Sequence, residues 1–296
     1  MGFASLMGNV QRLMASAEAL AAIGAELRLR QSGSECDPQV RMLLQRIIEF
    51  IDPALLDGVE PQQQAIVLNG ISSYFRQAAD LLENPARPPG WMVHDPAVLQ
   101  AQGRASARIV HHINGLGATR TALLETLNAP GAFLDVGTGC GWLAIEAARL
   151  WPKMRVVGID PWELVLELAR KNVADSGVGD RIELRKLGAE ALNESDSYTL
   201  VWFASPFIPP AISRQAAQRS VRALRPGGWM IFGLYASLPD ALGESLAALR
   251  VVRSGGYPWM PAETESFLRD CGLELIETVR IPGEVAMPVI GRRPLG

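Results

Sequence analysis

The chain has 296 residues, of which 48% are hydrophobic and 20% are charged, and its formal net charge is −3. This composition is typical of a globular protein with one large domain or two small ones, and it excludes a disordered chain. The slightly acidic balance argues against nucleic acid as a partner, because nucleic-acid-binding proteins usually carry a basic surface.

The three cysteines, Cys36, Cys140 and Cys271, are far apart and form no CxxC pair. They therefore indicate neither a zinc site nor a disulfide framework, and they favour a reducing compartment. No run of 18 apolar residues occurs, so no transmembrane helix is expected. Residues 1–30 also lack the positive start and compact apolar run of a signal peptide. We predict a cytoplasmic protein with no membrane partner.

The first third of the chain is predicted to be helical. In residues 38–51 the apolar side chains recur with helical spacing, and residues 67–82 repeat the pattern. A proline-rich break covers residues 83–91, after which Asp95 and Pro96 are typical of a helix start. About four helices and no clear strand are expected before Leu116.

Strands alternate with helices from about residue 130 onward, which indicates βαβ units and a parallel sheet. Short apolar runs predict strands at 132–136, 155–160, 181–187, 198–204 and 228–235. Helical patterns separate them at 141–151, 162–175 and 211–224. Residues 273–293 are too short for another helical unit and predict a closing antiparallel hairpin. We expect a helical N-terminal cap and substrate-binding region at 1–115 and an α/β domain at 116–296.

The segment FLDVGTGCGW, residues 133–142, lies where the first strand ends and a helix begins. Free N–H groups at a helix start and the open backbone of glycine suit a nucleotide-like ligand. A dinucleotide motif would require glycine at position 142, where Trp142 stands. The pattern is instead Asp135, Gly137, Gly139, Gly141, and its leading acid suits a cationic ligand. A second acid, Asp160, ends the next strand, where a carboxylate can accept both hydroxyls of a ribose.

At these residues the sequence resembles the class I S-adenosylmethionine-dependent methyltransferases. LDVGTGCG and VVGIDPW are similar to that family's first and second motifs, LRKLGAEAL and YTLVWFASPF to its third and fourth, and ALRPGGWMIFG to its late helix–turn–strand segment. The resemblance covers roughly residues 116–296. It implies a Rossmann-like, seven-stranded, mostly parallel sheet with helices on both faces, a reversed last hairpin, and S-adenosylmethionine as cofactor.

The resemblance also assigns the cofactor-binding residues. The methionine part would contact the loop Gly137, Thr138, Gly139, Cys140 and Gly141, and Asp135 would help hold its amino group. The ribose would bind Asp160, and the adenine would lie beside Pro161, Trp162, Ala189 and Glu190. The family often carries an Asp in this third motif, which here has Ala189 beside Glu190. Phe203, Ala204 and Ser205 would line the floor of the site.

The fourth motif, residues 204–207, contains neither Asn nor Asp. Relatives that methylate nucleic-acid bases or glutamine amides often carry Asn/Asp-Pro-Pro-Tyr/Phe there, and metal-dependent catechol methyltransferases carry acids. We therefore predict no nucleic-acid substrate and no metal. The expected acceptor is a small, largely apolar molecule of specialised metabolism, such as a phenol or a carboxylic acid methylated at oxygen, and methylation at carbon or nitrogen stays an alternative.

Candidate residues for catalysis and acceptor binding are few. His94, His111 and His112 are the candidate bases, because the pKa of a free imidazole lies near neutrality. Each could equally be a surface or capping residue, and methyl transfer needs no base when the acceptor has already lost its proton. The candidate acceptor-binding residues are Trp91, Phe207, Tyr235 and Trp259. Residues 88–95 form either a lid or a plain linker, and Gly103 indicates close approach of either the cofactor or another helix.

Two other functions remain open for this sequence. The chain could bind S-adenosylmethionine without transferring a methyl group or could catalyse a different reaction with it. It could also be an NAD-dependent oxidoreductase, although Trp142 argues against this. A homodimer is possible if the N-terminal helices expose much apolar surface.

Overall fold

The structure, a computed structural model, describes residues 2–90, 94–237, 240–280 and 286–295. The chain forms two compact units, Met1–Arg87 and Pro88–Gly296. This division differs from the domain boundary expected at 115/116. Residues 88–115 belong to the second unit because two helices of this segment pack against the helix that follows the glycine loop.

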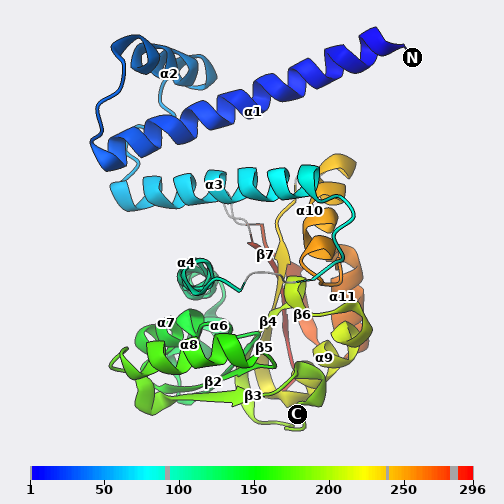
Figure 1. Cartoon of the computed structure of the whole chain (residues 1–296). Coiled ribbons are helices and arrows are strands. Elements are labelled where there is room, and N and C mark those ends of the chain that lie inside the picture. Colours follow the sequence, from blue (N-terminus) through cyan, green and yellow to red (C-terminus); the bar gives the residue numbers. More distant parts are fainter. Residues whose placement is uncertain (1, 91–93, 238–239, 281–285, 296) are drawn as a thin grey trace. The chain divides into compact units, whose positions relative to one another are not determined.

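The first unit consists of α1 (Phe3–Ser32), α2 (Pro38–Ile51) and α3 (Pro61–Glu83) (Figure 1). Asp37 caps α2, since its Oδ1 accepts hydrogen bonds from the backbone N–H groups of Gln39 at 2.9 Å and Val40 at 3.2 Å. α1 packs on both other helices. Gly24 permits the close approach to α3, because a Cβ at this position would lie 3.1 Å from Cγ2 of Ile71. The predicted helical character of this region is confirmed.

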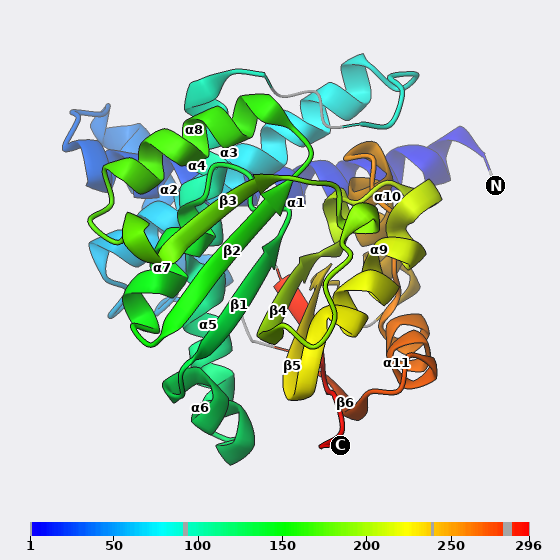
Figure 2. The same ribbon diagram turned by 90° about the horizontal axis from the view of Figure 1, so that it is seen from below.

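The second unit is built on a seven-stranded sheet with the order β3-β2-β1-β4-β5-β7-β6 (Figure 2). Its strands are β1 (Gly131–Val136), β2 (Met154–Asp160), β3 (Ile182–Lys186), β4 (Tyr198–Ala204), β5 (Leu224–Tyr235), β6 (Glu274–Thr278) and β7 (Ala286–Arg292). Neighbouring strands among β1–β5 pair in parallel, whereas β7 is antiparallel to both β5 and β6. The predicted fold class and the closing antiparallel hairpin are confirmed.

Helices cover both faces of this sheet. The helices of this unit are α4 (Pro96–Ser106), α5 (Arg108–Gly117), α6 (Thr121–Asn128), α7 (Trp142–Leu150), α8 (Glu163–Ala174), α9 (Pro210–Ala223), α10 (Ala241–Arg253) and α11 (Pro261–Asp270). Along β1, Leu134 and Val136 face a hydrophobic cluster that includes α9 and α11. Phe133 faces the opposite cluster, which includes α5, α6 and α7. Both faces of the sheet are therefore buried, as expected for parallel strands.

The structure differs from the sequence expectation in several helices. The helical segment whose start was expected at Asp95 and Pro96 forms two helices, α4 and α5, with a break at Ala107. There the Ser106 hydroxyl donates a 2.6 Å hydrogen bond to the carbonyl of Gly103, a local bond that competes with helix continuation. α6, α10 and α11 were not predicted. Within the described residues, no helix combines the length and apolar character needed to cross a membrane.

Candidate functional site

The glycine loop joins β1 to the first turn of α7. Gly137, Gly139 and Gly141 have φ angles of 80°, 53° and 79°, a left-handed conformation that L-residues rarely adopt. A Cβ at Gly141 would lie 3.2 Å from Cβ of Ala169, so this glycine is needed for packing. A Cβ at Gly139 would meet no atom within 4 Å, so the backbone there faces open space where a ligand can approach.

Asp160, at the end of β2, holds the glycine loop. Its Oδ2 accepts a hydrogen bond of 3.0 Å from the N–H of Gly139, and its Oδ1 accepts one of 2.9 Å from the N–H of Trp162. Burial raises the pKa of Asp160, and these two backbone N–H groups oppose that rise. The predicted ribose-binding acid therefore lies directly beside the predicted methionine-binding loop.

Asp135 lies at the end of β1, just before the glycine loop, and is buried, with 1% of its surface exposed. Its Oδ2 accepts a 2.7 Å hydrogen bond from the hydroxyl of Thr138, whereas Oδ1 has no hydrogen-bond partner among the described residues. Burial raises the pKa of this carboxyl to about 7; the Thr138 bond lowers it and the nearby Asp160 raises it further. A buried acceptor without a partner fits a cationic donor, such as the amino group of S-adenosylmethionine.

The predicted adenine region lies at the ends of β2 and β3. The N–H of Leu187 donates to the carbonyl of Asp160 at 3.1 Å, which brings the segment after β3 to the ribose-binding acid. Glu190 folds back over Gly188, where a Cβ would lie 2.4 Å from its Oε1. Its buried Oε2 has no hydrogen-bond partner among the described residues. Ala189 is buried and has no polar side-chain atom. Of these two residues, Glu190 is therefore the one whose side chain can accept a hydrogen bond from an adenine amino group.

The end of β4 lies beside the glycine loop. Phe203 pairs with Val136 of β1, and a Cβ at Gly137 would lie 3.5 Å from Cβ of Ala204. Phe203 is fully buried, with its ring 4.8 Å from that of Phe232. The hydroxyl of Ser205 donates a 2.7 Å hydrogen bond to the carbonyl of Gly233, which joins the end of β4 to β5.

The three candidate bases lie in different places. The His94 ring meets the Trp162 ring edge-on at 5.5 Å, so His94 lies next to a predicted adenine-binding residue. His111 is exposed, and its Nε2 lies 2.9 Å from Oε1 of Glu146 on α7. His112 lines a small apolar cavity between α5 and the middle of the sheet, beside Trp202. His94 therefore contacts a predicted cofactor residue.

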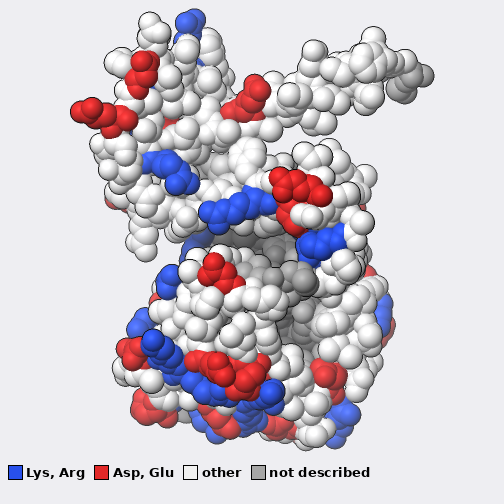
Figure 3. All heavy atoms as spheres, viewed as in Figure 1, with Lys and Arg blue, Asp and Glu red and all other residues white. Residues whose placement is uncertain are grey.

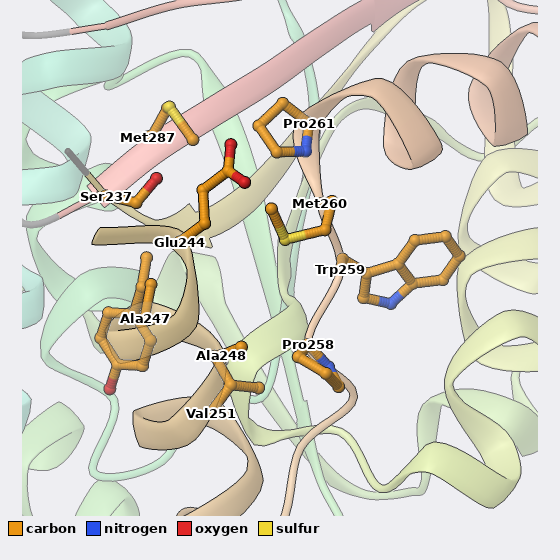
Figure 4. A pocket seen from close by; sticks show the side chains of 11 residues that line it. Ser237, Glu244, Ala247, Ala248, Val251, Pro258, Trp259, Met260, Pro261 and Met287 are labelled. Carbon is orange, nitrogen blue, oxygen red and sulfur yellow. The ribbon is translucent and has the colours of Figure 1, made fainter. Parts of the chain in front are cut away.

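A pocket lies at the end of β5 (Figure 4). Its lining residues are Tyr235, Ser237, Glu244, Ala247, Ala248, Val251, Pro258, Trp259, Met260, Pro261 and Met287. The indole of Trp259 points away from the pocket in Figure 4, and its Nε1 donates to the hydroxyl of Ser213 at 2.8 Å. Tyr235 meets the ring of Phe207 edge-on at 6.2 Å. Trp91 lies outside the described residues.

Sequence reasoning missed one group of residues at the glycine loop. Gln100 on α4 and Asn172 on α8 hydrogen-bond to each other, to the indole of Trp142 and to the carbonyl of Cys140. No sequence signal links these amides, because 72 positions separate them. Gly103 is explained by the same contact, since a Cβ there would lie 2.8 Å from Cδ1 of Trp142. Close helix packing therefore accounts for this glycine.

Comparison with known families identifies the domain. Residues 133–228, which run from β1 to the first residues of β5, match a family model described as a methyltransferase domain. The chain therefore contains a methyltransferase domain of the class I, S-adenosylmethionine-dependent kind. The matched segment contains the glycine loop, Asp160 and the end of β4. The unpartnered oxygens of Asp135 and Glu190 fit S-adenosylmethionine, the cofactor of this family.

Individual relatives agree with this methyltransferase assignment. The chain is 31% identical over 207 residues to a ribosomal protein L11 methyltransferase of Symbiobacterium thermophilum, covering 66% of this chain and 62% of the relative. It is 36% identical over 135 residues to the corresponding protein of Sorangium cellulosum, covering 43% of this chain and 41% of the relative. The chain thus spans less than two thirds of these curated relatives.

A solved structure shares the fold over the full length of this chain. An O-methyltransferase family protein from Burkholderia thailandensis superposes with a TM-score of 0.63 at 15% identity, covering 100% of this chain and 99% of that chain. At this identity the likeness concerns the fold alone. It includes the helical N-terminal region as well as the α/β sheet.

Proposed function

We propose that this methyltransferase transfers a methyl group from S-adenosylmethionine to an oxygen atom of a small, largely apolar molecule. The observation that carries the proposal is the largely apolar pocket at the end of β5, because β1, β4 and β5 are parallel and the glycine loop follows β1 at the same edge of the sheet. The fourth motif supports it as well, because Ala204-Ser205-Pro206-Phe207 offers no Asn or Asp to bind an amide or a base nitrogen.

The pocket is connected to the cofactor site through the segment that follows β4. The segment before α11 touches this point closely, since a Cβ at Gly256 would lie 2.0 Å from the carbonyl oxygen of Pro206. The N–H of Tyr257 donates to the carbonyl of Ile208 at 3.2 Å. The ring contact between Phe207 and Tyr235 joins the end of β4 to the pocket wall. An acceptor in this pocket would lie beside the strand end that borders the glycine loop.

The lining of the pocket favours an apolar acceptor with few polar groups. Alanine, valine, proline and methionine side chains make up most of the wall. The polar groups are the hydroxyls of Tyr235 and Ser237 and the carboxylate of Glu244, which enters the pocket in Figure 4. A phenol or a carboxylic acid with an apolar body matches this surface, because burial of its body removes apolar area from water.

When bound, S-adenosylmethionine supplies a methyl group on a positively charged sulfur, which an oxygen can displace in line. The chain's own part is to bind, orient and exclude water. Asp135 would accept a hydrogen bond from the amino group, Asp160 from the ribose hydroxyls and Glu190 from the adenine amino group. The apolar wall would exclude water from the acceptor. His94, His111 and His112 stay proposals for a base, and a metal-free reaction stays a prediction.

We also propose that a second copy of this chain binds the N-terminal half of α1. Phe3, Leu6, Met7, Leu13 and Met14 have exposed fractions between 38% and 77%. Leu6 and Leu13 lie seven residues apart, as do Met7 and Met14, and this spacing is typical of a helix-pairing surface. Arg12 is the one charged residue between Phe3 and Ala17, and this part of α1 is almost uncharged on the face shown in Figure 3. A surface with so little charge does not favour nucleic acid or an anionic membrane.

The test is a methyl-transfer assay with S-adenosylmethionine labelled in its methyl group. Acceptor panels of phenols, carboxylic acids, amines and thiols would be compared with ribosomal protein and RNA. We expect label in an oxygen-methylated small molecule. Label in the macromolecules alone would overturn the proposed acceptor class while leaving the methyltransferase assignment intact. The cytoplasmic location is a separate prediction, and fractionation of the source cells tests it.

Calorimetric titration separates this activity from the two other functions considered for the sequence. We expect binding of S-adenosylmethionine and of its demethylated product, S-adenosylhomocysteine, and none of NAD. Binding without label transfer to any acceptor would favour a cofactor-binding protein or another reaction. Binding of NAD alone would favour an oxidoreductase.

A further inference from the structure

Four groups from three helices and the glycine loop form one hydrogen-bonded set. Gln100 Oε1 accepts from the indole Nε1 of Trp142 at 2.6 Å and from Nδ2 of Asn172 at 3.0 Å. Gln100 Nε2 donates back to Oδ1 of Asn172 at 3.0 Å. Asn172 Nδ2 also donates to the carbonyl of Cys140 at 2.8 Å. Both hydrogens of the Asn172 amide are therefore used, one on Gln100 and one on the loop.

The carbonyl that receives the last bond lies in the centre of the glycine loop. Cys140 stands between Gly139 and Gly141, both of which have positive φ angles. Glycine backbone has more conformational freedom than any other residue, so this loop loses much entropy when it is fixed. Asp160 holds the loop from one side through the N–H of Gly139. The Asn172 amide holds it through the carbonyl of the next residue.

The set also fixes α4 against the loop. Gly103 of α4 lies against Trp142 and Cys140, where a Cβ would be 2.8 Å and 3.2 Å from their side chains. The guanidinium of Arg104 lies over the Trp142 ring at 5.7 Å. Leu99 of α4 is 4% exposed and belongs to a small hydrophobic cluster with Cys140 and Val165. α4 is thus packed on the cofactor loop itself.

We propose that Gln100 and Asn172 are positioning residues for S-adenosylmethionine. The Gln100 amide orients Asn172, which holds the carbonyl of Cys140 and keeps the loop in the shape that receives the cofactor. This inference rests on the methyltransferase assignment. It adds α4, which lies outside the segment that resembled the family in sequence, to the cofactor site.

The test compares Gln100→Met, which keeps the side-chain length but removes all three bonds, with Gln102→Met as the control. Gln102 is exposed on the same helix. Calorimetric titration with S-adenosylhomocysteine should show binding about tenfold weaker for Gln100→Met, the effect of losing about one net hydrogen bond. Gln102→Met should bind as the wild type does. In the methyl-transfer assay, KM for S-adenosylmethionine should rise about tenfold while kcat changes less than twofold.

The combination Gln100→Met with Asn172→Ala tests whether the two amides act together. If they do, the double variant should bind little more weakly than either single variant. Gln100→Glu keeps an acceptor for both the indole and the Asn172 amide but loses the donor to Oδ1 of Asn172, so it should recover part of the lost affinity. Independent, multiplying losses in the double variant would overturn the joint role of the amides.

A merely structural role for Gln100 predicts a different result. It would lower the melting temperature of Gln100→Met and leave the affinity for S-adenosylhomocysteine unchanged, which would overturn the proposal. If Gln100→Met does not fold, Gln100→Glu and Asn172→Ala are compared with the wild type in its place. We expect about tenfold weaker binding in Asn172→Ala and a smaller loss in Gln100→Glu, and wild-type affinity in Asn172→Ala would overturn the proposal. Absence of binding in the wild type would instead overturn the proposed function.

Discussion

Oδ2 of Asp160 accepts a 3.0 Å hydrogen bond from the backbone N–H of Gly139, although 21 positions separate these residues in the sequence. The bond joins the end of β2 to the centre of the loop that follows β1. The same carboxylate accepts from the N–H of Trp162 through its other oxygen. The acid assigned to the ribose hydroxyls therefore also sets the path of the glycine loop, and a substitution there would affect both parts of the cofactor site.

Asp160→Ala should weaken the binding of S-adenosylmethionine and S-adenosylhomocysteine by about 10- to 100-fold. This factor corresponds to a loss of about 1.5–3 kcal/mol of binding free energy, the contribution of a hydrogen bond to a charged group. Calorimetric titration checks it. Asp175→Ala is the control, because it removes the same charge from an exposed position at the end of α8. Equal affinity of Asp160→Ala and wild type would contradict the site.

Cofactor binding should strengthen as the pH rises through about 7. The pKa of Asp135 is raised to about 7 by burial, so the carboxyl is largely protonated at pH 6. A cationic amino group binds the ionised form, so binding should release a proton. Affinity should therefore rise about five- to tenfold between pH 6 and pH 7.5. The measurement is calorimetric titration in buffers of different ionisation enthalpy, and Asp135→Asn should show neither the pH dependence nor the proton release.

Asp135→Asn should also be more stable than the wild type at pH 8. The pKa of Asp135 rises from 3.8 to about 7 on folding, so the folded state binds the proton more tightly than the unfolded state. The contribution of Asp135 to stability is thus most favourable below pH 4, falls between pH 4 and 7, and is least favourable above pH 7. Asn has no such dependence. We expect a melting temperature at pH 8 raised by about 2–4 °C, with a smaller difference at pH 5; an unchanged melting temperature at both pH values would contradict the raised pKa.

Ala248→Phe should reduce kcat/KM for the acceptor by tenfold or more, because the added ring would fill the pocket at the end of β5. Ala248 is half-buried in the pocket wall and is not part of the glycine loop. The affinity for S-adenosylhomocysteine should therefore stay unchanged. Leu249→Phe, at the neighbouring exposed position of α10, is the matched control. Unchanged turnover in Ala248→Phe would show that the acceptor binds elsewhere.

The wild type should sediment as a dimer at micromolar concentration if α1 pairs with a second copy. The double substitution Leu6→Gln and Leu13→Gln should shift the equilibrium toward the monomer, since both side chains are more than half exposed on the proposed surface. Analytical ultracentrifugation measures the mass. Leu82→Gln, an equally apolar and exposed position at the end of α3, should leave the dimer intact. A monomeric wild type would contradict the pairing.

The sequence by itself determined the parallel sheet, its reversed hairpin and the cofactor loop. These features depend on residues close together in the chain: alternating strand and helix patterns, glycines at positions that require positive φ angles, and acids at the ends of strands. The boundaries of β4 were predicted to the residue, because YTLVWFA is a continuous buried run between clear turn signals. Local chain physics suffices for such elements.

Only the tertiary structure decided which distant side chains meet. The helical segment that begins at Pro96 divides at Ala107, and its first part packs on the glycine loop through Gln100 and Gly103. Trp259 packs against Ser213 and the surrounding aromatic core, and His94 lies beside Trp162. These contacts join segments far apart in the sequence. They are set by how helices fit against the sheet, which no local pattern of residues encodes.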